Sequence, residues 1–104
     1  MTIVRSWAAH TTAEHLPAYV KHVRTRVLPV LNQIDGYEGA RLLQRPTGDA
    51  IEVVVLTRWR SLDAIRRFAG DDLEAAVVEE DAAVLLLDFD PRVKHYDVAL
   101  EDGD

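Results

Sequence analysis

Residues 50–70 have the sequence AIEVVVLTRWRSLDAIRRFAG, in which an apolar strand runs through a tryptophan into a short helix. The strand places apolar side chains at Ile51 and at each of residues 53–56, so both of its faces are apolar. Such a run is typical of a central strand that is covered on both faces. Ser61 can cap the helix that follows, and the apolar stripe of this helix ends at Gly70. The stretch therefore predicts a strand–helix unit whose sheet needs a cover on each side.

The segment before this unit predicts a strand and a long helix. Residues 2–10, TIVRSWAAH, are typical of a strand, and either Thr11 or Thr12 can cap the helix that follows. Apolar residues then recur at spacings of three and four as far as about residue 33, which predicts a helix that packs on the sheet. Because Pro29 lies inside this helix and lacks a backbone donor, we expect a kink or a local break near it.

The remaining sequence predicts a hairpin, a helical region and a last strand. The Asp-Gly pair at 35–36 ends the long helix, residues 37–45 form a strand, and the turn at residues 46–49 joins this strand to the next as a hairpin. Residues 71–90 hold apolar side chains among many acids, which predicts one or two further short helices ended by a proline. Residues 92–100, RVKHYDVAL, alternate well enough to form a final strand.

The order of these elements is strand, helix, strand, strand, helical region, strand. This is the split βαβ pattern of an α+β, ferredoxin-like βαββαβ fold, in which an antiparallel sheet carries helices on one face and has its first and third strands in the middle. At 104 residues the chain is expected to form a single domain over residues 1–104, with 101–104 as a polar tail. The open face of the sheet then needs a partner, and a second copy of the chain is the commonest one. We therefore predict a homodimer.

Composition and charge exclude several classes of function. The net charge is −6, and residues 1–70 carry ten Lys or Arg against six Asp or Glu, whereas residues 71–104 carry two against twelve. A nucleic-acid-binding domain would normally show a dominant basic surface, so no nucleic-acid partner is expected. No apolar run approaches the roughly 20 residues of a membrane span, and residues 1–10 lack the order of a signal peptide. We therefore expect a cytoplasmic protein with no membrane partner.

The sequence also offers little support for a metal site or for a catalytic nucleophile. The chain has no cysteine, which excludes disulfides, thiolate metal sites and Cys nucleophiles. His15 and His22 are seven residues apart, which is two helical turns and too far for both to bind one metal ion without distortion. Neither a phosphate-binding Gly-rich loop nor a Ser nucleophile elbow is present in the sequence. We therefore predict no metal site.

Three segments carry a resemblance to a known family. They are LTRWRSLDAIRRFAG at residues 56–70, DGYEGARLLQR at residues 35–45 and FDPRVKHYDV at residues 89–98. Together with the element order, they make the chain similar to the antibiotic-biosynthesis-monooxygenase-like domains of the dimeric α/β-barrel superfamily. The resemblance implies a homodimer whose two sheets close into a barrel, with a ligand cavity in each subunit between sheet and helices. Characterised relatives oxidise phenolic polyketides without a metal or flavin, and others cleave haem.

Oxidation without a cofactor sets requirements that particular residues could meet. An acidic phenol or enol must become an electron-rich anion that can pass an electron to O2, so the protein supplies a base, groups that stabilise the anion, and a dry pocket. His95, on the final strand, is the candidate catalytic base because imidazole titrates near neutral pH. Arg5 or Arg41 could hold the anion. The aromatic residues that could wall a substrate pocket are Trp7, Tyr19, Trp59, Phe68 and Tyr96.

Each of these residues also has a purely structural alternative. A histidine on an end strand can be a hydrogen-bonded structural residue, and Trp59 can serve core packing alone. The residues Tyr19, His15, His22 and Arg26 share one flank of the long helix by the 3.6-residue period. That flank is either a solvated edge or part of a site.

The sequence departs from the active relatives at three positions. Both the phenol-oxidising and the haem-cleaving relatives use an Asn in the site, whereas the only Asn of this chain is Asn32, near the end of the long helix. The haem-cleaving relatives also place a Trp where this chain has Phe68, and a His where it has Val78. The resemblance therefore argues against haem cleavage of that kind. It favours a homodimeric monooxygenase that oxidises an aromatic or polyketide-type molecule with O2 and no bound cofactor. The alternatives are a non-catalytic small-molecule-binding homodimer, and a haem-binding or isomerase relative.

Overall fold

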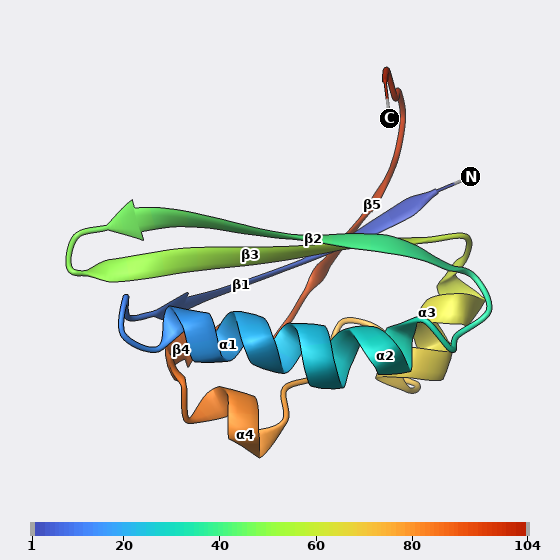
Figure 1. The fold of residues 1–104 in the computed structure, drawn as a ribbon. Coiled ribbons are helices and arrows are strands. Elements are labelled where there is room, and N and C mark those ends of the chain that lie inside the picture. Colours follow the sequence, from blue (N-terminus) through green and yellow to red (C-terminus); the bar gives the residue numbers. More distant parts are fainter. Residues whose placement is uncertain (1, 104) are drawn as a thin grey trace.

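The computed structural model describes residues 2–103 and shows an antiparallel sheet with helices packed against one of its faces (Figure 1). The strands are β1 (Ile3–Thr11), β2 (Tyr37–Thr47), β3 (Ala50–Trp59), β4 (Leu86–Phe89) and β5 (Lys94–Asp97). Their order is β2-β3-β1-β4, and β5 also pairs with β1. The first and third strands are therefore central, which confirms the predicted α+β, ferredoxin-like architecture.

The helices are α1 (Leu16–His22), the π-helix η1 (Val23–Val27), α2 (Leu28–Leu31), α3 (Leu62–Ala69) and α4 (Glu80–Ala83). The first three follow one another directly and form one long helix across the sheet (Figure 1). In η1 the amide of Leu28 donates to the carbonyl of Val23, five residues back. Pro29 follows immediately. It has no N–H, and its ring would clash with the carbonyl four residues before it in a regular α-helix. The wider π-helical turn relieves this clash. The irregularity that the sequence predicts near Pro29 is this π-helical turn.

Caps and glycines fix the ends of the helices. The amide of His15 donates to the Thr12 hydroxyl at 3.1 Å, so Thr12 rather than Thr11 caps the start of the long helix. The amide of Ala64 donates to the Ser61 hydroxyl at 3.1 Å, as predicted for α3. Gly36 has φ +101°, and a Cβ at this position would lie 2.6 Å from the Cβ of Ala64. Only glycine therefore allows the chain to enter β2 so close to α3.

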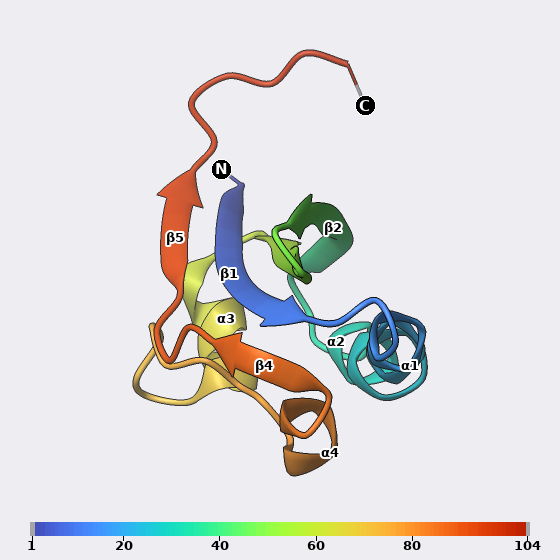
Figure 2. The same ribbon diagram turned by 90° about the vertical axis from the view of Figure 1, so that its left-hand side faces the viewer.

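The C-terminal third differs from the sequence prediction. The expectation of short helices over residues 71–90 holds for α4 but is wrong for residues 86–89, which form β4. The final strand predicted at residues 92–100 is the shorter β5. Both strands run along β1, one beside each half of it (Figure 2), with Pro91 between them. Because proline cannot donate to the ladder, the edge strand is split in two at this point.

The chain leaves the sheet after Val98, whose amide donates to the Thr2 carbonyl at 3.0 Å. Residues 98–103 have no regular secondary structure and extend away from the body of the protein (Figures 1 and 2). They include the first three residues of the predicted polar tail, while residue 104 lies outside the described residues.

The two faces of the sheet have different surroundings. On β1 and β3 the side chains of Ile3, Val53 and Trp59 face the helices and are buried, Val53 and Trp59 completely. The alternate positions, among them Val54 and Leu56, face the other way and are only partly buried, since no element within residues 2–103 covers that face. We call it the open face. The apolar run at residues 51–56 is thus covered on one of its two faces within the described part of the chain.

Candidate functional site

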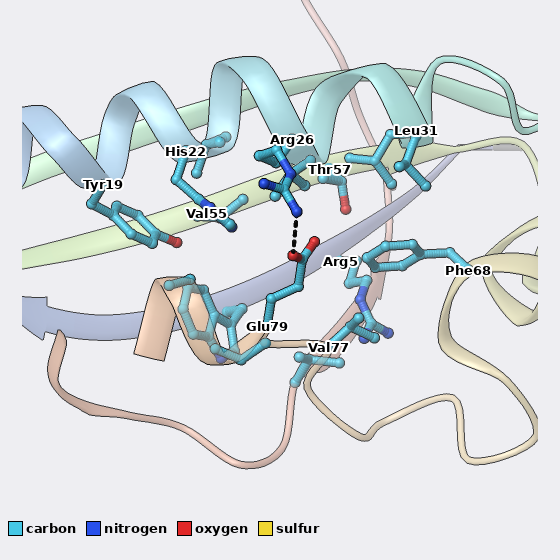
Figure 3. Close-up of a pocket in the computed structure, with 17 residues that line it drawn as sticks. Arg5, Tyr19, His22, Arg26, Leu31, Val55, Thr57, Phe68, Val77 and Glu79 are labelled. Carbon is cyan, nitrogen blue, oxygen red and sulfur yellow. Dashed lines mark ion pairs between the residues drawn. The ribbon is translucent and has the colours of Figure 1, made fainter. Parts of the chain in front are cut away.

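A cavity of about 270 Å³ lies between the sheet and the long helix (Figure 3). Its floor comes from neighbouring positions of the two central strands, where Arg5 is paired with Thr57 and Trp7 with Val55. Because side chains alternate along a strand, these four residues point to the same face of the sheet. The roof is the long helix, one end is closed by Phe68 of α3, and residues 77–79 with α4 form the remaining wall.

The roof contains the π-helical turn. Val23, Arg26 and Val27 of η1 all line the cavity, and His22 lines it from the last turn of α1. A π-turn inserts one residue into the helix and rotates the following side chains, and such turns occur often at functional sites. The helix flank noted in the sequence as either an edge or a site lies partly on the cavity, since Tyr19, His22 and Arg26 all line it.

Arg5 is the central charged residue of the floor, and only 5% of its surface is exposed. Its guanidinium donates to the carbonyl oxygens of Leu73 and of Ala75, the latter at 2.8 Å, and it lies 5.8 Å from the centre of the Phe68 ring. Burial lowers the pKa of Arg5 from its ordinary value, yet an arginine stays charged at any physiological pH. Within residues 2–103 no carboxylate pairs with it. The cavity therefore contains a fixed cation without a counter-ion.

His95 lies behind Arg5 and does not line the cavity. Its Nε2 is 2.9 Å from Nη1 of Arg5, and because a guanidinium can only donate, Nε2 accepts and the imidazole is neutral with its proton on Nδ1. Burial, followed by the charge of Arg5, lowers the pKa of His95. The nitrogen that would take a proton from a substrate is thus engaged, and the catalytic role that the sequence suggested for His95 stays a prediction.

The other residues suggested by the sequence fall into two groups. Trp7, Tyr19 and Phe68 line the cavity together with Arg5, whereas Trp59, Arg41 and Tyr96 do not. Trp59 is completely buried in the core, and its Nε1 donates to the Thr57 hydroxyl at 2.8 Å.

The last two residues lie on the open face of the sheet. Arg41 is exposed on β2 opposite Leu56, and Tyr96, which pairs with Val4, is 54% exposed. Neither side chain is therefore near the cavity.

Tyr19 is the second polar group enclosed by the cavity, and only 4% of its surface is exposed. Burial raises the pKa of its phenol to about 12, so the hydroxyl remains protonated at physiological pH. At the mouth, Arg26 of η1 and Glu79 form an ion pair of 3.6 Å that crosses from the roof to the opposite wall (Figure 3). Glu79 could not be predicted from the sequence, because its partner Arg26 lies on an element that is distant in the chain.

The cavity offers little to a metal ion. Within residues 2–103 no group of three or more His, Cys, Asp or Glu side chains is placed to hold one. Phe68 and Val78, which stand where the resemblance puts the Trp and His of haem-cleaving relatives, contribute only apolar surface to the walls. His22 is the one imidazole among the described residues that line the cavity. None of the helices in the described part of the chain has both the length and the apolar character needed to cross a membrane.

Comparison with known proteins identifies the family. The family model described as antibiotic biosynthesis monooxygenase matches residues 3–80. The chain belongs to the antibiotic biosynthesis monooxygenase family. A putative monooxygenase of this family from Bacillus cereus has a similar solved structure, with a TM-score of 0.65 and 16% identity over 99% of this chain and 98% of that chain. The resemblance seen in the sequence is thus confirmed for the family and the fold.

Two other solved structures with the antibiotic biosynthesis monooxygenase fold are named for two different reactions. The heme-degrading protein Rv3592 from Mycobacterium tuberculosis aligns with a TM-score of 0.64 and 22% identity, over 100% of this chain and 98% of that chain. SnoaB, a cofactor-independent oxygenase from Streptomyces nogalater, aligns with a TM-score of 0.58 and 20% identity, over 96% and 93%. At these identities the likeness establishes the fold, and one fold carries more than one reaction.

Among curated sequences, the chain resembles uncharacterized protein Rv2558 of Mycobacterium tuberculosis. The two are 34% identical over 99 residues, which cover 90% of this chain and 39% of that protein. The same match is found in a second strain of that organism. This member of the monooxygenase family thus spans about two fifths of the length of the curated relatives it matches.

Proposed function

We propose that this protein is a cofactor-independent monooxygenase that oxidises an aromatic or polyketide-type small molecule with O2 in the cavity. One observation carries the proposal: a partly enclosed and largely apolar cavity holds the buried cation of Arg5, which has no carboxylate partner within residues 2–103. Oxidation without a cofactor proceeds through a substrate anion, and a preorganised cation in a dry site stabilises such an anion far more than water does.

The chemistry can be written in full for a ring methylene that is conjugated with a carbonyl, directly or through aromatic rings. Removal of a proton gives an enolate, which transfers an electron to O2. The two radicals combine, and loss of water leaves a ketone, so that CH2 and O2 become C=O and H2O. Arg5 would stabilise the enolate oxygen. His22 is the candidate base, because it lines the cavity and its ring nitrogens have no hydrogen-bond partner within residues 2–103, whereas Nε2 of His95 is occupied by Arg5.

Oxygen uptake with anthrone, in which the reacting methylene lies between two rings, tests the proposal. We expect uptake above the buffer rate, one O2 per ketone formed, and 18O from labelled O2 in the product. Arg5→Met should lower the rate by about 100-fold, the usual cost of losing one group that stabilises an oxyanion. Arg24→Met removes an exposed arginine of η1 that does not line the cavity and should leave the rate unchanged.

A non-catalytic small-molecule-binding protein is the alternative from another class. It is favoured by the position of the only Asn, since Asn32 is exposed and its side-chain amide donates to the Leu28 carbonyl within the helix. If anthrone and hydroquinone substrates bind to the wild-type protein but give no uptake above buffer, the protein is a binder and the oxygenase proposal fails.

Haem is the alternative substrate that one structural neighbour suggests by name. The imidazole of His22 could approach a haem iron, but the cavity of about 270 Å³ lies below the usual range for ligand sites, about 300–1,000 Å³. A porphyrin would therefore require the long helix to move away from the sheet. A Soret band that persists through gel filtration, and that is lost in His22→Ala, would favour this alternative.

We further propose that the protein is a homodimer formed through the open face. Leu43 is 47% exposed there, beside the half-buried Val54 and Leu56, and within residues 2–103 nothing covers them. Leu43→Glu should convert the dimer to a monomer in sedimentation velocity at micromolar concentration. Val84→Glu places the same charge at a position next to α4 that is 75% exposed, and it should leave the dimer intact. A monomeric wild-type protein would refute the proposal. The cytoplasmic location stays a prediction from the sequence.

A further inference from the structure

We infer that the ligand of the cavity is a planar organic anion of two or three rings that places its negative oxygen on Arg5 and a second oxygen on the hydroxyl of Tyr19. The inference rests on the proposed function and names its substrate class. Arg5 and Tyr19 are each about nineteen-twentieths buried, and both line the cavity. A site built from two enclosed polar groups selects ligands that satisfy both, because leaving either one unpaired is costly.

Arg5 keeps a donor free for such a ligand. Its two terminal nitrogens donate to the carbonyls of Leu73 and Ala75 and to His95, whereas its Nε–H has no partner within residues 2–103. In that part of the chain every fully buried side-chain nitrogen or oxygen has a hydrogen-bond partner, so Nε is not fully buried. Arg5 is one of the residues that line the cavity, so its Nε–H is the donor available to a ligand there. The three bonds that hold the guanidinium fix its orientation, so the free N–H is preorganised for an anion.

Tyr19 supplies the second polar contact. Figure 3 shows its ring reaching down from α1 with the hydroxyl directed into the cavity. No hydrogen bond from this hydroxyl is formed within residues 2–103, although the residue is 96% buried. A neutral phenol in this position can donate to a carbonyl, hydroxyl or ether oxygen of a ligand.

The positions of these two groups set the length of the ligand. Tyr19 belongs to the same buried cluster as Ala9 of β1, while Arg5 lies near Phe68 at the other end of the cavity (Figure 3). Ala9 and Arg5 are four residues apart on the strand, a span of about 13 Å. The tyrosine ring covers part of this span, and about two or three fused rings fit in the remainder. The surface between them is formed by Trp7 and by valines, which suits a flat apolar body.

Calorimetric titration of the wild-type chain with substituted naphthalenes tests the inference. The probe is 6-hydroxy-2-naphthoate, which carries an anion at one end and an oxygen at the other. Its methyl ester lacks the charge, and 2-naphthoate lacks the second oxygen. We expect the probe to bind at least about tenfold more tightly than the ester, since hydrogen bonds to charged groups are among the strongest in proteins. It should bind several-fold more tightly than 2-naphthoate.

Two variants assign these differences to residues. In Arg5→Met the probe should bind no more tightly than its methyl ester. In Tyr19→Phe the probe should bind no more tightly than 2-naphthoate but should still bind more tightly than the ester. Arg24→Met is the matched control, since Arg24 is exposed on η1 and does not line the cavity, and it should change neither ratio. A further arm uses 2-hydroxy-1,4-naphthoquinone, whose enol is ionised at neutral pH. Tighter binding of this compound than of the naphthoates identifies the anion as an enolate, and the reverse order identifies it as a carboxylate.

The comparison of acid and ester needs only the wild-type protein, so it stands even if Arg5→Met fails to fold. Equal affinity for acid and ester, or no binding of any naphthalene compound, overturns the inference. Binding with the expected preferences but without oxygen uptake would refute the oxygenase proposal and leave this inference intact. Oxygen uptake without a preference for the anion would do the opposite.

Discussion

The buried hydrogen bond from Trp59 to Thr57 makes a quantitative prediction about the core beneath the cavity. Trp59 is completely buried, Thr57 is 7% exposed, and the bond length is 2.8 Å. Thr57→Val keeps the shape of the side chain but leaves the indole N–H without an acceptor. An unsatisfied buried donor costs about 1–3 kcal/mol. With an unfolding entropy of about 0.2 kcal/mol/K for a chain of this length, a loss of about 2 kcal/mol lowers the Tm by about 9 °C.

The assay is thermal unfolding followed by circular dichroism, at one protein concentration for all variants because dimerisation would make the Tm concentration-dependent. Thr47→Val is the matched control, since it makes the same chemical change at an exposed position of β2 and should shift the Tm by no more than about 2 °C. Thr57→Ser keeps the acceptor and should fall between the wild type and Thr57→Val. If the two Thr→Val variants were equally stable, the hydroxyl of Thr57 would not be what satisfies the indole.

Two further predictions concern pH and backbone geometry. The lowered pKa of His95 means that the unfolded chain binds more protons than the folded one below about pH 6.5, so wild-type stability should fall as the pH drops from 7.5 to 5.5. In His95→Gln the amide oxygen can still accept from Arg5. The free energy of unfolding in urea should then depend less on pH than in the wild type. The same pH dependence in both proteins would show that His95 does not cause it. Gly36→Ala combines positive φ with a clash of 2.6 Å and should cost about 3 kcal/mol, whereas Gly48→Ala, which meets open space, should cost about 1 kcal/mol in the same unfolding experiment.

Local signals were sufficient for most of the fold. The cap at Ser61, the positive-φ glycine at 36 and the hairpin turn are all set by neighbours in sequence. The first two lie where they were predicted, whereas the turn predicted at residues 46–49 is shorter, because residues 46 and 47 extend β2 and pair with residues 51 and 50. The apolar run of β3 was correctly placed in the centre of the sheet. The prediction failed at residues 86–89, because a short apolar run next to acids fits a helix and a strand equally well, and only pairing with β1 decides between them.

The candidate site depended on information that a single sequence does not carry. Trp7, Tyr19 and Phe68 could be proposed because aromatic residues near a sheet are few, and the 3.6-residue period made the flank with His22 an open alternative. His95 was selected for its intrinsic pKa, but its environment follows from the register that places β5 beside β1 and sets His95 opposite Arg5. Register between distant strands is fixed by tertiary packing, so no pattern within either strand could reveal this pairing.

The segment that follows α3 explains how a buried arginine can remain without a counter-ion in so acidic a chain. In this segment Arg5 donates hydrogen bonds only to backbone oxygens, those of Leu73 and Ala75. The carboxylates on either side of Leu73 turn outward to Arg92, at 2.6 Å from Asp72 and 3.5 Å from Glu74. Carbonyl dipoles stabilise the guanidinium without cancelling its charge, whereas a carboxylate would occupy it. Backbone carbonyls thus hold the guanidinium of Arg5 in place while its positive charge stays available, as a site for an anionic ligand requires.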